Sequence, residues 1–342
     1  MIYPWQQTAW TQLQSMRARM PHAILFHGPA GIGKAGFLEA FAQSLLCENV
    51  QPDGQACNSC ASCGWFVQHN HPDYRRVRPE ALEDDPSVEG EETTDGDKKS
   101  KSTKAPSKEI KIEQIRALSD FMNISTHRQG LRVVVLYPAE ALNMPASNAL
   151  LKTLEEPPPG TVFLLASNSL DRLLPTILSR CRKFGLPMPD HAAALAWLKE
   201  QGVNDADSWL REEGGAPLAA FEKANGGSRE ELDTLLGFLA RPNVESALRQ
   251  ADKLSKTPLA ALVAWQQRWL YDLLSSKLAG SVRYYPRYQK ELAALAGNVH
   301  TANLLRAIKS ANERRAVADH PLSAKLFIED MLLDYAACCN AV

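Results

Sequence analysis

A short glycine-rich stretch is the first place in this sequence where residue types and their spacing could do chemistry. It follows an apolar run at residues 23–26 and has the pattern Gly-x-x-x-x-Gly-Lys. Its key members are Gly28, Gly31, Gly33 and Lys34. Glycines let successive backbone N–H groups curl around phosphate oxygens, and the lysine adds a positive charge. These residues are candidates for nucleotide binding. A tightly packed glycine turn between a strand and a helix is the alternative.

The groups that would let such a loop cleave a nucleotide are missing from the sequence. A catalytic loop has Ser or Thr after its lysine to bind Mg²⁺, but the residue here is Ala35. A buried strand is expected at residues 131–136, and in nucleotide hydrolases the tip of such a strand carries Asp and Glu. Tyr137 and Pro138 occupy these places. The loop is therefore suited to phosphate but not to catalysis.

Four of the seven cysteines are spaced like metal ligands. They are Cys47, Cys57, Cys60 and Cys63. Gaps of two residues bring thiolates within tetrahedral reach of one ion, so the spacing predicts one structural Zn²⁺ per chain with no open position for catalysis. Four free buried thiols are the alternative. His69 and His71 follow closely, and we expect them to be loop or capping residues rather than ligands.

Length and composition limit the class of protein. A chain of 342 residues with 45% hydrophobic residues predicts two or three globular domains. The formal net charge of −1 gives no overall attraction to nucleic acid or to an anionic membrane. The sequence shows neither a signal-like N-terminus nor a stretch of about 18 apolar residues, so we expect a cytoplasmic protein.

Two later regions differ in composition from the first 79 residues. Residues 80–108 are acidic, then basic, and almost without apolar side chains, which predicts a disordered insertion in the first domain. Beyond Pro189 no long strand-like run occurs, and leucines recur at helical spacing at positions 232, 235, 236 and 239. The second half of the chain is therefore expected to be helical.

An arginine closes a short predicted helix that starts near Pro175. It stands in the triplet Ser179-Arg180-Cys181. An arginine at the C-terminus of a helix is usually explained by the helix dipole and by solvent. The other motifs in the chain change that interpretation.

Taken together, the motifs resemble the clamp-loader branch of the AAA+ family, and within it the delta-prime subunits of bacterial DNA polymerase III. The motifs that carry the resemblance are the glycine loop, the four cysteines, Ala139-Glu140-Ala141-Leu142-Asn143, Leu154-Glu155-Glu156-Pro157-Pro158 and Ser179-Arg180-Cys181. A four-cysteine module inserted after a phosphate loop and followed by the last two motifs is distinctive. The insertion at residues 80–108 is not a feature of that family.

The resemblance implies an α/β RecA-like AAA+ core with an inserted zinc module, followed by an α-helical lid and an α-helical collar. The core would span residues 1–187 and include the zinc module at 47–63. The lid would span residues 188–227, and a collar that serves oligomerisation would span residues 228–342.

The resemblance also implies a function. Arg180 would be the trans arginine finger that reaches ATP bound by a neighbouring subunit, while this chain acts as a stator without ATPase activity. The partners would be the gamma or tau motor subunits and the delta subunit in a hetero-pentamer within the DNA-directed DNA polymerase III holoenzyme. That assembly would act on the sliding clamp and on primer–template DNA. Whether Gly28 to Lys34 still binds ATP stays open, and a free-standing P-loop ATPase is the alternative function.

Overall fold

The computed structural model describes residues 2–83, 106–123, 126–127, 130–226, 229–318 and 323–340. The chain divides into two compact units, Met1–Ala193 and Ala194–Val342. Among the described residues, no helix combines the length and the apolar character that a bilayer crossing requires. The predicted division of the second half into 188–227 and 228–342 stays a prediction.

The first unit is built on a five-stranded parallel sheet. In spatial order its strands are β2 (Tyr74–Val77), β3 (Arg132–Leu136), β4 (Thr161–Ser167), β1 (Ala23–His27) and β5 (Arg182–Gly185). Parallel strands end at the same edge of a sheet, so the segments that follow β1, β3 and β4 gather along one edge. The predicted RecA-like α/β core is confirmed.

The central strands are apolar on both faces because helices cover both faces. Alternate residues of β1 enter opposite cores, with Ile24 and Phe26 on one side and Ala23 and Leu25 on the other. Strands β3 and β4 alternate in the same way. This explains why these strands read as continuous apolar runs in the sequence.

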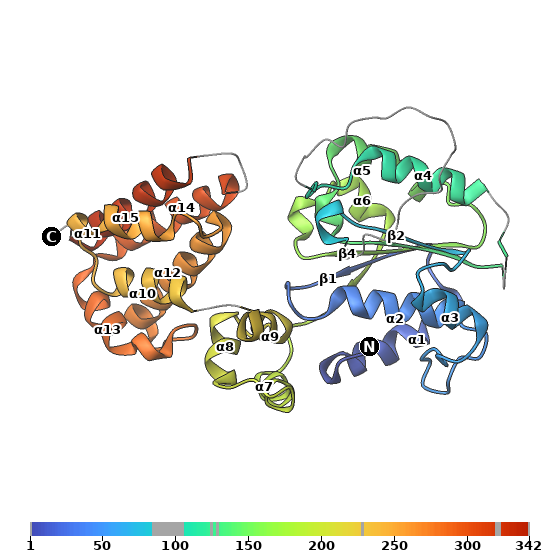
Figure 1. Ribbon diagram of the computed structural model, residues 1–342, viewed down its shortest axis with the longest axis horizontal. Helices are drawn as coiled ribbons and strands as arrows, with labels where there is room; N and C mark the ends of the chain where they lie inside the picture. The colour runs from blue at the N-terminus through green and yellow to red at the C-terminus, as the bar shows by residue number, and fades with distance from the viewer. Residues whose placement is uncertain are drawn as a thin grey trace, which may run out of the picture. The chain divides into compact units, whose positions relative to one another are not determined.

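Figure 1 shows the helices in two layers around this sheet. One layer consists of α1 (Gln7–Ser15), α2 (Lys34–Leu46) and α3 (Ala61–Val67). The other consists of α4 (Ile112–Asn123), α5 (Met144–Glu155) and α6 (Pro175–Arg180). Helix α5 begins where the Asn143 side chain accepts a hydrogen bond from Ala146 N, and it stops before three consecutive prolines. Helix α6 begins with Pro175, whose missing N–H costs nothing at that position.

The two outer strands were not predicted from the sequence. Strand β2 contains Arg75 and Arg76, and β5 contains Arg182 and Lys183, so neither has the apolar run that marks a buried strand. Each lies at an edge of the sheet, where one side of the strand is free and polar side chains reach solvent.

The edges of the predicted insertion are ordered. Residues Glu80–Leu82 form a 3-10 helix, and Ala81 N donates a hydrogen bond to Ser107 O at 3.0 Å. Lys111 forms an ion pair with Glu80 at 2.8 Å. The remainder of the insertion, 84–105, lies outside the described residues.

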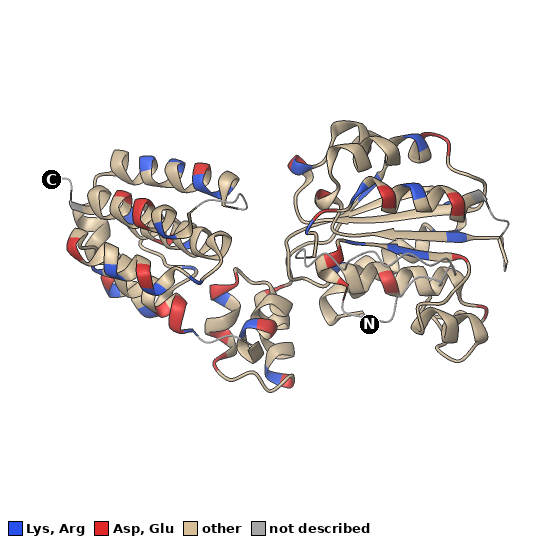
Figure 2. Ribbon diagram, turned by 45° about the horizontal axis from the view of Figure 1, so that its top comes forward, with Lys and Arg blue, Asp and Glu red and all other residues tan. Residues whose placement is uncertain are grey.

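The second unit is helical in its described part, as the leucine spacing predicts. Its helices are α7 (His191–Glu200), which starts at the end of the first unit, α8 (Ala206–Glu212), α9 (Pro217–Gly226), α10 (Glu230–Ala240), α11 (Val244–Leu254), α12 (Leu259–Ala279), α13 (Gln289–Asn298), α14 (Thr301–Val317) and α15 (Ala324–Asn340). Its buried residues form two separate clusters, one within 194–220 and one within 232–336. Figure 2 shows Lys and Arg interspersed with Asp and Glu along the helices.

Charged side chains link α8 to residues of the larger helical cluster. Glu212 is 3% exposed, and its carboxylate lies 3.3 Å from Arg229 and 3.4 Å from Arg287. Burial raises the pKa of Glu212, and the two arginines act in the opposite direction. Arg268 donates a hydrogen bond to Glu212 O and pairs with Glu213 at 3.2 Å. Three arginines thus hold the end of one short helix.

Candidate functional site

The glycine loop lies between β1 and α2, as predicted. Strand β1 ends at His27, and α2 begins at Lys34 with Gly33 as its N-cap in the left-handed conformation, φ 89°. In the parallel sheet His27 is level with Ser167, the last residue of β4. The loop is therefore placed beside the end of a neighbouring strand, where nucleotides bind in folds of this class.

Packing requires a glycine at position 28, and packing together with a left-handed backbone favours one at position 33. A Cβ atom on Gly28 would lie 2.1 Å from Leu186 O, and one on Gly33 would lie 2.7 Å from the Tyr3 ring. These glycines would be needed whether or not phosphate binds. The packed-turn alternative therefore accounts for these two positions but not for Lys34.

Aromatic residues near the N-terminus cover the loop, a role that the sequence did not reveal. The Tyr3 and Trp5 rings stack with centroids 4.9 Å apart. Trp5 Nε1 and Gln6 Nε2 donate to the carbonyl oxygen of Ile32 at 3.0 and 2.9 Å. These bonds join residues 26 and 27 positions apart, so helical or strand periodicity carries no sign of them.

Lys34 folds back onto its own loop. Its Nζ donates hydrogen bonds to Gly28 O, at 2.8 Å, and to Pro29 O. The residue is only 6% exposed, and this burial lowers its pKa to about 8, while the charge of Glu140 acts in the opposite direction. In this conformation the ammonium group is therefore bonded to carbonyl oxygens of its own loop.

At the three positions where a hydrolase would bind Mg²⁺ or activate water, the structure places neither a metal ligand nor a base. Ala35 has no side-chain oxygen. The Tyr137 hydroxyl donates to Glu39 Oε1 at 2.8 Å, and Glu39 also pairs with Arg76 at 3.5 Å. Burial, together with Glu39, raises the pKa of Tyr137 to about 12, so the phenol stays protonated at neutral pH. Pro138 has no polar side-chain atom.

Glu140 is a further charged group beside the loop, and the sequence reasoning gave it no role. One carboxylate oxygen accepts a hydrogen bond from Asn168 N at 3.0 Å. The other, Oε2, is buried without a hydrogen-bond partner among the described residues. Ser167, the last residue of β4, is fully buried and donates to Ser169 O at 2.9 Å.

The four predicted metal ligands come together. The sulfur atoms of Cys47, Cys57, Cys60 and Cys63 all lie within 4.8 Å of one another. Cys57 Sγ and Cys63 Sγ are 4.0 Å apart, close to the edge of a tetrahedron with metal–sulfur bonds of about 2.3 Å. A soft four-sulfur set suits zinc or iron rather than magnesium or calcium. The residues therefore fit a single tetrahedral metal ion.

Backbone N–H groups donate to the cysteine sulfurs. Cys57 N donates to Cys47 Sγ at 3.2 Å, Cys60 N to Cys57 Sγ at 3.3 Å, and Cys63 N to Cys60 Sγ at 3.4 Å. Such outer hydrogen bonds support thiolate ligands. Burial raises the pKa of Cys63 to about 12 and also raises the pKa of Cys47, so both thiols hold their protons unless a cation replaces them.

His71 supports the module from outside the sulfur cluster. Its Nδ1 accepts a hydrogen bond from Asp73 N at 3.1 Å, so the neutral ring has its proton on Nε2 and donates to Ser62 Oγ at 2.8 Å. Ser62 in turn donates to Leu46 O at the end of α2. His71 therefore has the structural role that we expected.

Arg180 is the last residue of α6, as predicted, and its described contacts are with α5 and its own helix. Nη1 donates to Thr176 O at 2.9 Å, and Nη2 forms an ion pair with Glu155. The arginine side chain is 30% exposed. A partly exposed guanidinium at the end of a helix can reach a group on another molecule.

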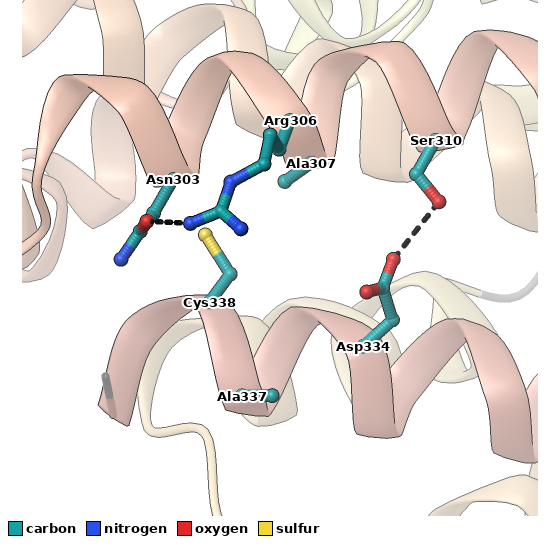
Figure 3. Close-up of a pocket in the computed structure, with 7 residues that line it drawn as sticks. All are labelled: Asn303, Arg306, Ala307, Ser310, Asp334, Ala337 and Cys338. Carbon is teal, nitrogen blue, oxygen red and sulfur yellow. Dashed lines mark hydrogen bonds between the residues drawn. The ribbon is translucent and has the colours of Figure 1, made fainter.

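The described cavities contain none of the predicted site residues. A cavity of about 390 Å³ lies between α14 and α15, where Arg306 and Cys338 face each other across the gap (Figure 3). Asp334, on the same wall as Cys338, accepts a hydrogen bond from Ser310. An apolar hollow of about 240 Å³ is lined by residues of α12 and α14.

The cysteine cluster predicts a metal content. The purified chain should contain about one tightly bound divalent ion, measured by elemental analysis. Cys60→Ser should release it and lower the stability of the first unit, because a metal bound only by the folded state contributes to folding. Cys338→Ser, outside the cluster, should keep the ion. A wild-type chain that is fully stable without metal would contradict the prediction.

The burial of Lys34 predicts an unusual titration. Its folded pKa of about 8 lies below the ordinary 10.5, so between these pH values the folded chain binds fewer protons than the unfolded chain. The contribution of this group to the free energy of unfolding is therefore unfavourable below pH 8 and improves as the pH rises to 10.5. NMR of ¹³C-labelled lysine, with Lys34→Arg to assign the signal, should show a midpoint near pH 8. A Lys34 signal that does not change until pH 10 would contradict this.

Comparisons with known proteins agree with the geometry. A family model described as "DNA polymerase III, delta subunit" matches residues 5–190. DNA polymerase III subunit delta' of Pseudomonas aeruginosa is 37% identical over 285 residues, 81% of this chain and 78% of that protein. The delta' subunit of Haemophilus influenzae is 30% identical over 81% of this chain and 78% of its own length. The tau subunit of Bacillus subtilis is 26% identical over 93% of this chain and 45% of its own length. The chain belongs to the family of DNA polymerase III delta' subunits.

Proposed function

We propose that this chain is a non-hydrolysing stator of the DNA polymerase III clamp loader. It donates Arg180 to ATP bound by a neighbouring subunit while the sliding clamp is loaded onto primed DNA in replication. The proposal rests on a difference between two parts of the chain, the end of α6 and the surroundings of the glycine loop. The chain keeps a partly exposed arginine at the end of α6, but Ala35, Tyr137 and Pro138 replace the groups that bind Mg²⁺ and activate water.

The chemistry of phosphoryl transfer supports a role for Arg180. Negative charge develops on the transferred phosphoryl group, and a guanidinium delivered from a neighbouring chain neutralises it, which raises the rate by about 10³–10⁵-fold. Arginine presents a planar fork of donors to phosphate oxygens, which lysine does not. A subunit can therefore assist hydrolysis without holding a hydrolytic site of its own.

Membership of the family supports a set of partners. The chain would join the gamma or tau motor subunits and the delta subunit in a hetero-pentamer, and it would reach the sliding clamp and primer–template DNA through that complex. Its relatives are delta' subunits and a tau subunit of DNA polymerase III, which supports membership of a multi-subunit replication assembly. The assembly would work in the cytoplasm.

The lid, the collar, the metal site and the glycine loop would each have a separate role in this function. Residues 188–227 would form a lid, and 228–342 a collar that packs against the collars of other subunits. The ion held by the four cysteines would be structural Zn²⁺, which has no open coordination position and takes no part in the reaction. Gly28 to Lys34 would be a degenerate phosphate loop whose lysine is bonded to loop carbonyls.

The arginine-finger role predicts a selective loss in the reconstituted complex. Arg180→Ala should lower DNA-stimulated ATP hydrolysis and clamp loading by at least about tenfold at the site it serves, because one positive charge is removed from the transition state. Metal content and thermal stability should stay unchanged, because the arginine is partly exposed. Arg182→Ala, an exposed arginine on β5, is the matched control. Equal rates for the two variants would contradict the role.

The alternative function, a free-standing P-loop ATPase, makes the opposite prediction for the isolated chain. With ATP and Mg²⁺ and no partner, the stator hypothesis expects turnover no higher than the background, because positions 35, 137 and 138 lack ligands for the metal and a base for water. Lys34→Ala is the control for contaminating ATPases, since it should not change a background rate. Turnover by the wild type that Lys34→Ala abolishes would favour the alternative.

A further inference from the structure

We propose that Glu155 is a positioning residue for Arg180 that holds the guanidinium at rest and must release it when a nucleotide is presented. This inference rests on the proposed function of Arg180 and adds a regulatory step to it. The phosphate groups of the neighbouring subunit's nucleotide would replace the Glu155 carboxylate as the counter-ion of the arginine.

The ends of two packed helices create this contact. Glu155 is the last residue of α5 and Arg180 is the last residue of α6, and the two helices pack against each other. Nη2 of Arg180 is bonded to Glu155 Oε1, and Nη1 donates to Thr176 O at 2.9 Å. Both terminal nitrogens of the guanidinium are therefore already engaged within the chain.

The ion pair between Glu155 and Arg180 is exposed enough to be broken. The Glu155 side chain is 49% exposed and the Arg180 side chain 30% exposed, so water and salt reduce their attraction. A triphosphate carries several negative charges, whereas the Glu155 carboxylate carries one and accepts a hydrogen bond from a single terminal nitrogen, Nη2. The exchange of partners is therefore downhill once the nucleotide arrives.

The pair also opposes catalysis while it lasts. A carboxylate on Nη2 neutralises the charge that the finger would bring, and its own negative charge would repel the γ-phosphate. An exposed ion pair of this type shifts an equilibrium by about 2–5-fold. Loss of the Glu155 charge should raise the free fraction of the arginine by a similar factor.

The adjacent residue gives a matched control. Glu156 has the same side chain in the same motif, is exposed, and has no ion pair among the contacts described for the chain. Glu156→Gln changes the net charge as Glu155→Gln does but leaves the Arg180 contact in place. A difference between the two variants therefore reports the contact rather than the total charge.

The first test needs only the isolated chain and does not depend on the proposed function. Phenylglyoxal modifies accessible arginines, and peptide mass mapping gives the rate at Arg180. Glu155→Gln should raise that rate about 2–5-fold, in line with a typical exposed ion pair, and high salt should remove most of the difference. Glu156→Gln should match the wild type. Equal rates for both variants at low salt would overturn the proposal.

The second test uses the reconstituted complex at sub-saturating ATP. Glu155→Gln should raise DNA-stimulated ATP turnover by up to about fivefold, Glu155→Asp should restore part of the restraint, and Glu156→Gln should have no effect. The double variant with Arg180→Ala should behave like Arg180→Ala alone. If Arg180→Ala has no effect, the finger role itself fails. If Arg180→Ala lowers turnover but Glu155→Gln matches Glu156→Gln or also lowers turnover, only the role of Glu155 fails.

Discussion

The parallel pairing of β1 between β4 and β5 is the constraint on which the first unit depends. It sets the ends of these strands level with one another. The loop after β1 therefore begins beside Ser167, and Gly28 lies against Leu186 O. Because Leu186 O leaves no room for a side chain at position 28, the same pairing also dictates a glycine there. Phosphate-loop geometry and sheet packing therefore impose the same residue, so a glycine at position 28 does not by itself indicate that the loop binds phosphate.

Much of the fold could be predicted from the sequence because its strongest physical signals are local. Strands covered on both faces read as apolar runs, prolines mark the ends of α5 and the start of α6, and leucine spacing marks the later helices. Strands β2 and β5 gave no such signal because edge strands carry arginine and lysine. At the two ends of the insertion Glu80 contacts Ser107 and Lys111, and composition contains no information about these contacts.

The candidate site, like the fold, could be predicted where its signals are local in the sequence and not where they join distant positions. Cysteine spacing predicted the sulfur cluster, because two-residue gaps nearly determine the geometry, and the glycine pattern predicted the loop. The contacts that modify these motifs join distant positions. Tyr137 meets Glu39 across 98 residues, and Arg180 meets Glu155 across 25. No short-range pattern encodes such partners. Ala35, Tyr137 and Pro138 could be identified from the sequence, but the contacts of Tyr137 and Arg180 appear only in three dimensions.

Helix α2 is a single rigid connection between two chemically different ends. It starts at Lys34 in the loop and stops one residue before Cys47, and Ser62 of the sulfur module donates a hydrogen bond to its final carbonyl at 2.6 Å. Oxidation of the thiols, or removal of an ion that they hold, would therefore loosen the far end of the helix that supports the glycine loop. In this way the order of the sulfur module would bear on the geometry of the loop at the other end of the helix.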